Sequence, residues 1–174
     1  MKSFPSVDFV VRWKPFLLRP HFPVEGKAKD PDTPSNPRVN PRMKAVGAAA
    51  GINFTGKTDR YPNTVFAHAL LKYAEKDYTK QNELQEVLFR HYFTDGRYPD
   101  ATNLRAAAEE VGLNAEEAIS FASSPKIQAE VKQEALAASS QGISGVPFFI
   151  INDQPCFSGA QPPERFEQIF NDLQ

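Results

Sequence analysis

The chain has 174 residues, of which 41% are hydrophobic and 24% are charged, and its formal net charge at pH 7 is −1. This length is enough for one domain with a sizeable core, and the balanced charge argues against nucleic acid or an anionic membrane as a partner. No apolar run is long enough to span a membrane, and the first residues lack a signal-peptide core, so we expect a cytoplasmic protein.

The sequence contains a single cysteine, Cys156. An intrachain disulfide or a C-x-x-C redox pair therefore cannot form within it, and we interpret Cys156 as a small packed side chain. The histidines His21, His68 and His91 lie far apart and lack metal-ligand spacing, so we expect no metal site. We also expect no bound cofactor.

The N-terminal part predicts a strand followed by a long loop. Apolar and polar residues alternate from Val7 to Trp13, which is typical of a strand with one buried face. Prolines and charges crowd residues 19–40 and predict an irregular loop. A short helix should then begin at Pro41, with Asn40 as its cap, and end at Gly51.

Residues 51–58, GINFTGKT, match the phosphate-binding pattern G-x-x-x-x-G-K-[ST] letter for letter. The chemistry of that loop requires a strand before it and a helix beginning at its lysine. Here a helix is predicted before Gly51, and Pro62 obstructs a helix after Thr58. We therefore interpret the match as an ordinary loop rather than a nucleotide site.

Residues 63–141 are almost entirely helical in pattern, because apolar residues recur there at intervals of three and four. Polar caps and glycine stops divide this block into several helices. The residues that begin or end these helices are Asp100, Asn114, Ser124, Gly96, Gly112 and Gly142.

The stretch Gly142–Ile151 changes from glycine-rich to strongly apolar. Pro147 stands at the mouth of a predicted strand, where a cis Val146–Pro147 bond would explain a proline. Residues 148–152, a turn at 152–155 and residues 156–158 predict a β-hairpin. A final helix with an apolar stripe is predicted from Gly159 onward.

Ser158 and Gly159 fall at the predicted start of that last helix. A serine cap, free N–H groups and the helix dipole together suit a bound carboxylate. Plain helix capping is the alternative, and the residues alone favour it.

Three blocks of sequence together resemble the DsbA-like thioredoxin family in its FrnE-type branch, with kappa-class glutathione transferases and 2-hydroxychromene-2-carboxylate isomerases as relatives. The blocks are VRWKPFLL at 11–18, NT at 63–64 with AH at 67–68, and GISGVPFF at 142–149 with SGAQ at 158–161. The resemblance implies an α/β, thioredoxin-like fold, with residues 1–62 and 142–174 as the sheet portion and residues 63–141 as a helical insertion.

The resemblance also implies a substrate-binding site formed by Val146, Pro147, Ser158 and Gly159. In the family a cis proline lies beside the active site, and the residue before it pairs with a bound peptide or with glutathione. In the glutathione-binding relatives, a serine at the position of Ser158 would hold the γ-glutamyl carboxylate. No residue of this chain is expected to be catalytic.

The chain departs from the family at its beginning. The family starts with a strand and a helix that carries C-x-x-C, or serine in the transferases, before the strand matched by Val7–Trp13. We expect both elements to be missing here, and Cys156 alone cannot provide an attacking and a resolving thiol.

The missing strand would lie between Val7–Trp13 and Phe148–Ile151, so its loss would leave backbone groups unpaired. We expect one of three outcomes: the two strands close up, another segment or chain fills the gap, or this region is poorly ordered. A complete four-stranded thioredoxin sheet would contradict the expected truncation.

The favoured function is that of a thiol–disulfide oxidoreductase family member, truncated and without its own cysteine pair. One alternative is a non-catalytic protein that binds peptide or glutathione, and another is a glutathione-dependent transferase or isomerase. The expected partner is a thiol or disulfide protein, or glutathione as a substrate. The sequence does not determine the oligomeric state.

Overall fold

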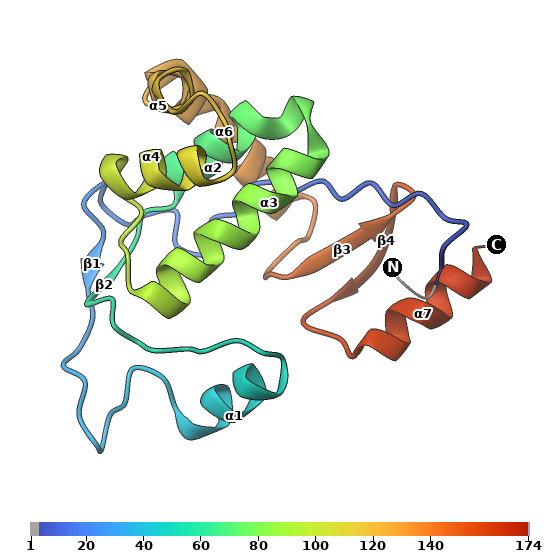
Figure 1. The fold of residues 1–174 in the computed structure, drawn as a ribbon, viewed down its shortest axis with the longest axis horizontal. Helices are drawn as coiled ribbons and strands as arrows, with labels where there is room; N and C mark the ends of the chain where they lie inside the picture. Colours follow the sequence, from blue (N-terminus) through green and yellow to red (C-terminus); the bar gives the residue numbers. More distant parts are fainter. Residues whose placement is uncertain (1–3, 174) are drawn as a thin grey trace.

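The computed structural model describes residues 4–173 (Figure 1). In this part the helices are α1 (Pro41–Ala49), α2 (Val65–Tyr73), α3 (Tyr78–Phe89), α4 (Ala101–Glu110), α5 (Ala115–Ala122), α6 (Pro125–Ser140) and α7 (Pro163–Asp172). The 3-10 turn η1 (Ala74–Lys76) follows α2, and the π-helical turn η2 (Arg90–Asp95) follows α3. Strands β1 (Lys27–Ala28) and β2 (Arg60–Tyr61) form one antiparallel pair, and β3 (Phe148–Ile151) and β4 (Gln154–Ser158) form another.

The helix boundaries follow the capping residues seen in the sequence. The side chains of Asn40, Asp100 and Asn114 each accept a hydrogen bond from the backbone N–H three residues later, at 2.8, 2.9 and 3.2 Å. Gly96 and Gly112 have φ of 78° and 72°, the left-handed conformation that ends helices. These predictions are confirmed because capping depends on residues that are close in sequence.

The helical block has one apolar core, formed where α2, α4, α5 and α6 pack together with α3 (Figure 1). Leu70, Leu84, Leu104 and Val131 are fully enclosed in it. Burying each such side chain contributes about 1.5–3 kcal/mol, so this core is the main source of stability for residues 65–131.

A second, aromatic cluster joins the hairpin to α7. The ring of Phe166 lies 4.9 Å from that of Phe149 and 5.0 Å from that of Phe157. Phe170, one turn further along α7, contacts Phe9 at 4.9 Å between ring centroids. The edge-to-face geometry of these rings is the favourable one for aromatic pairs. The division of the chain into a sheet portion and a helical insertion stays a prediction.

The prediction of a strand at Val7–Trp13 is wrong, although its alternation is right. Val7, Phe9, Val11 and Trp13 are partly buried and the residues between them are exposed, as in a strand. No strand of the described chain pairs with this segment, which runs from α7 past the hairpin to the helical block (Figure 1). A strand needs a hydrogen-bonded neighbour, and β3 has one only in β4 within residues 4–173.

The side chain of Gln81 fixes the end of this segment to the helical block. Its Oε1 accepts from the backbone N–H of Trp13 at 2.9 Å, and its Nε2 donates to the carbonyl of Trp13 at 3.2 Å. Gln81 is only 1% exposed, and its amide thus satisfies the two backbone groups as a neighbouring strand would. The indole N–H of Trp13 adds a hydrogen bond to Asn82 at 2.9 Å.

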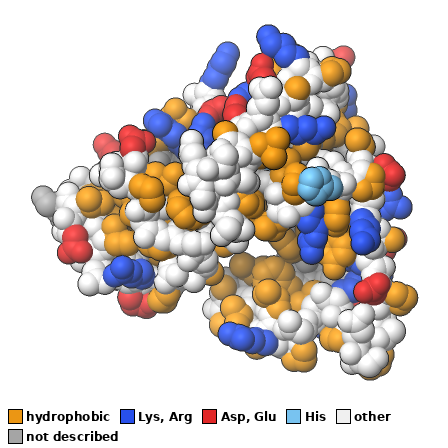
Figure 2. Space-filling model, turned by 180° about the vertical axis from the view of Figure 1, so that it is seen from behind, with side chains coloured by type: hydrophobic (Ala, Val, Ile, Leu, Met, Phe, Trp, Pro, Cys, Tyr) orange, Lys and Arg blue, Asp and Glu red, His pale blue; other side chains and the backbone are white. Residues whose placement is uncertain are grey.

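The predicted loop at residues 19–40 contains the short strand β1, which sequence reading missed because two residues carry no periodic pattern. After this loop, α1 projects away from the rest of the fold (Figure 1). Seen from behind, the surface is hollowed between this projection and the remaining structure, and hydrophobic side chains gather there (Figure 2). Among the helices of residues 4–173, none has the length and apolar character needed to cross a membrane.

Candidate functional site

The hairpin that carries the candidate site is formed as the sequence predicts. Phe148 pairs with Ser158 and Ile151 pairs with Gln154. The tight turn uses Asn152 and Asp153 at φ of 50° and 61°, which matches the positive φ values of a type I′ turn. Both residue types tolerate this conformation, so the turn follows from the local sequence.

The loop before β3 presents Val146 and Pro147 at the surface. The Val146–Pro147 peptide bond is cis, and the side chain of Val146 is 46% exposed. The backbone N–H of Gly159 donates to the carbonyl of Pro147 at 2.8 Å, directly beyond the Phe148–Ser158 pair. The structure therefore brings all four expected residues, Val146, Pro147, Ser158 and Gly159, to one end of the hairpin.

The interpretation of Ser158 as the cap of the last helix is wrong. Helix α7 begins at Pro163, its N-cap is Pro162, and neither residue has a backbone N–H to offer. Glu164 adds a negative charge to the first turn. The expectation failed because Pro162 and Pro163 set the helix start, as prolines at N1 often do. The hydroxyl of Ser158 has no hydrogen-bond partner among residues 4–173 and is exposed.

One edge of β3 is open. Strand β4 is the one partner of β3 in the described chain, so the other edge offers unpaired backbone N–H and C=O groups. Ile150 on β3 is 55% exposed, and Val146 in the loop before β3 is also exposed. An open edge beside exposed apolar side chains can add an extended peptide by backbone hydrogen bonding.

Cys156 is exposed, which contradicts the interpretation of a packed side chain. The register shifts between Phe149 and Ile150, so Phe149 faces Phe157, Ile150 faces Pro155, and Cys156 has no partner across the hairpin. Such a bulge turns the extra residue away from the regular pattern. Its sulfur is 3.5 Å from the carbonyl of Gln154.

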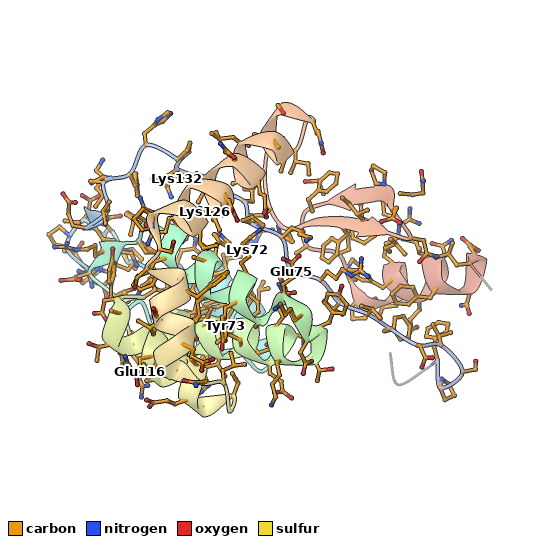
Figure 3. All side chains as sticks on the ribbon, turned by 90° about the horizontal axis from the view of Figure 1, so that it is seen from above. Lys72, Tyr73, Glu75, Glu116, Lys126 and Lys132 are labelled. Atoms are coloured by element: carbon orange, nitrogen blue, oxygen red, sulfur yellow. The ribbon has the colours of Figure 1, made fainter. Side chains whose placement is uncertain are left out.

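His68 lies in the helical block, on α2. Burial lowers its pKa from 6.5 to about 4, while a hydrogen bond to the backbone of Phe16 opposes this shift. His68 lines a cavity of about 10 Å³, room for about one water molecule, together with Lys72 and Glu75. Figure 3 shows Lys72 and Glu75 on the side of the helical block nearer the hairpin.

His91 is buried in the helical block, at the start of η2. Its Nε2 lies 3.1 Å from a carboxylate oxygen of Glu110, whereas its Nδ1 has no partner. A hydrogen bond from Arg90, and then one with His91, lowers the pKa of Glu110. His21 is exposed on the loop before β1. Within residues 4–173 no group of His, Cys, Asp and Glu has the arrangement of a metal site.

The phosphate-binding pattern at residues 51–58 lacks the structural context of a nucleotide site. Helix α1 precedes it, and the short strand β2 rather than a helix follows it. Thr58 is buried, and its hydroxyl accepts a hydrogen bond from Lys29 at 2.8 Å. The segment is therefore a loop between α1 and β2, and the interpretation that it is not a nucleotide site stays a prediction.

Comparisons with known proteins place the chain in a family. The DSBA-like thioredoxin domain matches residues 2–171. A probable DsbA oxidoreductase from Streptomyces coelicolor is 32% identical to the chain, with a TM-score of 0.65 over 75% of this chain. The match spans 57% of that protein. A search of curated proteins found no match.

These matches confirm the predicted α/β, thioredoxin-like fold with its many helices. The assignment to the FrnE-type branch, and the kinship with glutathione transferases and isomerases, stay predictions. The chain belongs to the family of DsbA-like thioredoxin domains, whose members are related to thiol–disulfide oxidoreductases.

Proposed function

We propose that this chain binds the extended, cysteine-containing segment of a thiol or disulfide protein beside Val146 and Pro147. The observation that carries this proposal is the exposed Val146–Pro147 loop, whose carbonyl at Pro147 is held by the N–H of Gly159 at 2.8 Å. A loop fixed in this way can offer the Val146 backbone to a peptide without first becoming ordered.

In this proposal the chain acts as the substrate-binding part of an oxidoreductase site and does not exchange disulfides with its own thiols. Exchange requires an attacking thiolate and a resolving thiol, and the sequence contains Cys156 alone. Cys156 lies on the bulge of β4 and has no partner residue across the hairpin.

Ser158 and Gly159 are proposed to border the bound peptide. The hydroxyl of Ser158 is exposed and unpartnered in the described chain, so it can accept or donate to a ligand. Glutathione is less well supported as the ligand. The N–H of Gly159 is already used by Pro147, and Glu164 opposes a carboxylate at the start of α7.

The test is peptide binding measured by calorimetry together with an insulin-reduction assay. A peptide with one cysteine between apolar residues should bind the chain, whereas the same chain should not reduce insulin. A version of the chain preceded by a strand and a C-x-x-C helix of the family should do both. A folded wild-type chain that does not bind the peptide would contradict the proposal.

The control variant is Val24→Asp, because Val24 is 83% exposed and lies on the loop before β1. It should bind peptide as the wild type does, whereas Val146→Asp should not. Glutathione binding is measured in the same calorimeter, and binding of glutathione without peptide binding would favour the transferase alternative.

Cytoplasmic location stays a prediction that cell fractionation can test.

A further inference from the structure

The segment Val7–Trp13 is extended but has no hydrogen-bonded neighbouring strand in the described chain, and it is held at both ends. Phe9 packs against Phe170 at 4.9 Å, and the backbone of Trp13 is held by Gln81. Between these anchors, no backbone hydrogen bond of residues 8–12 occurs within the described chain. An unpaired strand of this kind is a template for another strand.

The free edge of this segment can be assigned from the hydrogen bonds of Trp13. In an extended strand the backbone groups of successive residues point to opposite edges. The N–H and C=O of Trp13 face Gln81, so those of Val11 and Phe9 face the same way. The backbone groups of Asp8, Val10 and Arg12 therefore face the opposite edge, which β3, β4 and the other strands leave unpaired.

The side chains along this segment are complementary to a second copy of themselves. Asp8, Val10 and Arg12 are all exposed, with Val10 at 59%. If two copies run antiparallel about a twofold axis at Val10, then Asp8 lies opposite Arg12 of the other copy, on both sides of the axis. The apolar Val10 then lies opposite its own copy. Opposite charges and apolar pairs directly across an antiparallel ladder are stabilising.

Neither charge is already used in an ion pair. Asp8 and Arg12 make no ion pair with any residue between 4 and 173. The guanidinium of Arg12 lies over the ring of Tyr78 at 4.6 Å. Stacking of this kind holds the guanidinium flat and leaves the N–H groups at its rim available to a carboxylate.

We propose that the chain forms a twofold-symmetric dimer in which residues 7–13 of two copies pair as antiparallel strands centred on Val10. Asp8, Val10 and Arg12 exchange backbone hydrogen bonds with Arg12, Val10 and Asp8 of the other copy. The interface is isologous, because the same residues contribute on both sides. It uses a different segment from the proposed peptide site at Val146 and Pro147.

Cysteine cross-linking tests the register directly. In the Cys156→Ser background, Val10→Cys should form a disulfide-linked dimer under mild oxidation. A hydrogen-bonded antiparallel pair has its Cα atoms about 5.5 Å apart, within the range of a disulfide. Val24→Cys in the same background is the matched control, since Val24 is another exposed valine outside the proposed interface and should not become disulfide-linked.

Charge reversal tests the pairing of Asp8 with Arg12. Asp8→Arg and Arg12→Asp each place like charges opposite one another, so each should weaken the dimer at least about tenfold in sedimentation equilibrium. The double variant restores the opposite-charge pairs and should return the dissociation constant to within about threefold of the wild type. High salt should weaken the wild-type dimer.

Several results would overturn the proposal. One is a wild-type chain that remains monomeric at the highest concentration reached in sedimentation. Another is a Val10→Cys variant that cross-links no faster than Val24→Cys. A third is a double charge variant as weak as either single one, which would place the dimer contact elsewhere on the chain.

Discussion

The side chain of Gln81 holds the backbone of Trp13 through two hydrogen bonds, although 68 residues separate them in sequence. Gln81 also donates to the carbonyl of Leu71 at 3.3 Å, so one amide satisfies groups from two parts of the chain. It lies on α3 and ties the segment that follows Val7 to the helical block. The relationship explains why a polar residue is buried in an apolar region.

Replacing Gln81 with leucine should lower the free energy of unfolding by about 2–4 kcal/mol, because it removes the partner of two partly buried backbone groups of Trp13 and of the buried carbonyl of Leu71. Gln85→Leu is the matched control: Gln85 is a buried glutamine on the same helix and has no side-chain hydrogen bond in the described chain. Urea unfolding measures both. Equal effects from the two variants would contradict this role for Gln81.

Gly159→Ala should weaken peptide binding at the candidate site. Gly159 has φ of 84°, and a Cβ there would meet no atom within 4 Å, so the cost is backbone strain of about 1 kcal/mol. The strain shifts the N–H that holds Pro147. Gly112→Ala is the control, with φ of 72° and equally open surroundings on the helical block. Urea unfolding should show a similar loss of stability for the two variants. Calorimetry should detect weaker peptide binding only for Gly159→Ala.

Protonation of His68 should destabilise the fold between about pH 6.5 and 4. Burial lowers the pKa of His68 from 6.5 to about 4, so the unfolded chain binds a proton that the folded chain does not. The contribution of neutral His68 to the free energy of unfolding is complete above pH 6.5 and is lost as the pH falls toward 4. The upper limit of this contribution is about 3.5 kcal/mol, since one pKa unit corresponds to about 1.4 kcal/mol.

Urea unfolding across this range checks the prediction, with His68→Gln as the comparison. The variant should lose most of the dependence on pH between 6.5 and 4. Glu110 affects stability in a different pH range. Because its pKa is lowered from 4.5 in the folded chain, its contribution to the free energy of unfolding is present above pH 4.5 and is lost at lower pH. An unchanged slope in His68→Gln would assign the effect to other groups.

Phe166→Ala should loosen the hairpin and leave the helical block folded. The ring of Phe166 lies 4.9 Å from that of Phe149 and 5.0 Å from that of Phe157, whereas Phe170, the other aromatic residue of α7, makes a ring contact with neither in the described chain. Truncation of a packed aromatic side chain costs about 3 kcal/mol, or less where it is half-buried as here. Hydrogen exchange should accelerate in β3 and β4 but not in α2 or α5. Equal acceleration in both would mean that the two clusters unfold together.

Much of the fold could be predicted because it depends on neighbouring residues. The caps at Asn40, Asp100 and Asn114 and the turn at Asn152–Asp153 each rest on a side chain or φ value that its own sequence specifies. The three blocks of sequence that resemble the DsbA-like thioredoxin family predicted the family that the comparisons confirm. For the candidate site, the sequence identified which residues would lie together at one end of the hairpin.

The sequence by itself determined the helices, the hairpin turn and the lack of a cysteine pair, because each of these follows from residue type and short-range spacing. Only the tertiary structure decided whether Val7–Trp13 forms a strand, since that depends on a hydrogen-bonded neighbour rather than on alternation. It also decided that Gln81 satisfies the backbone of Trp13, and that the N–H of Gly159 binds Pro147 rather than opening a helix. These contacts join residues distant in sequence, so they depend on how the elements pack.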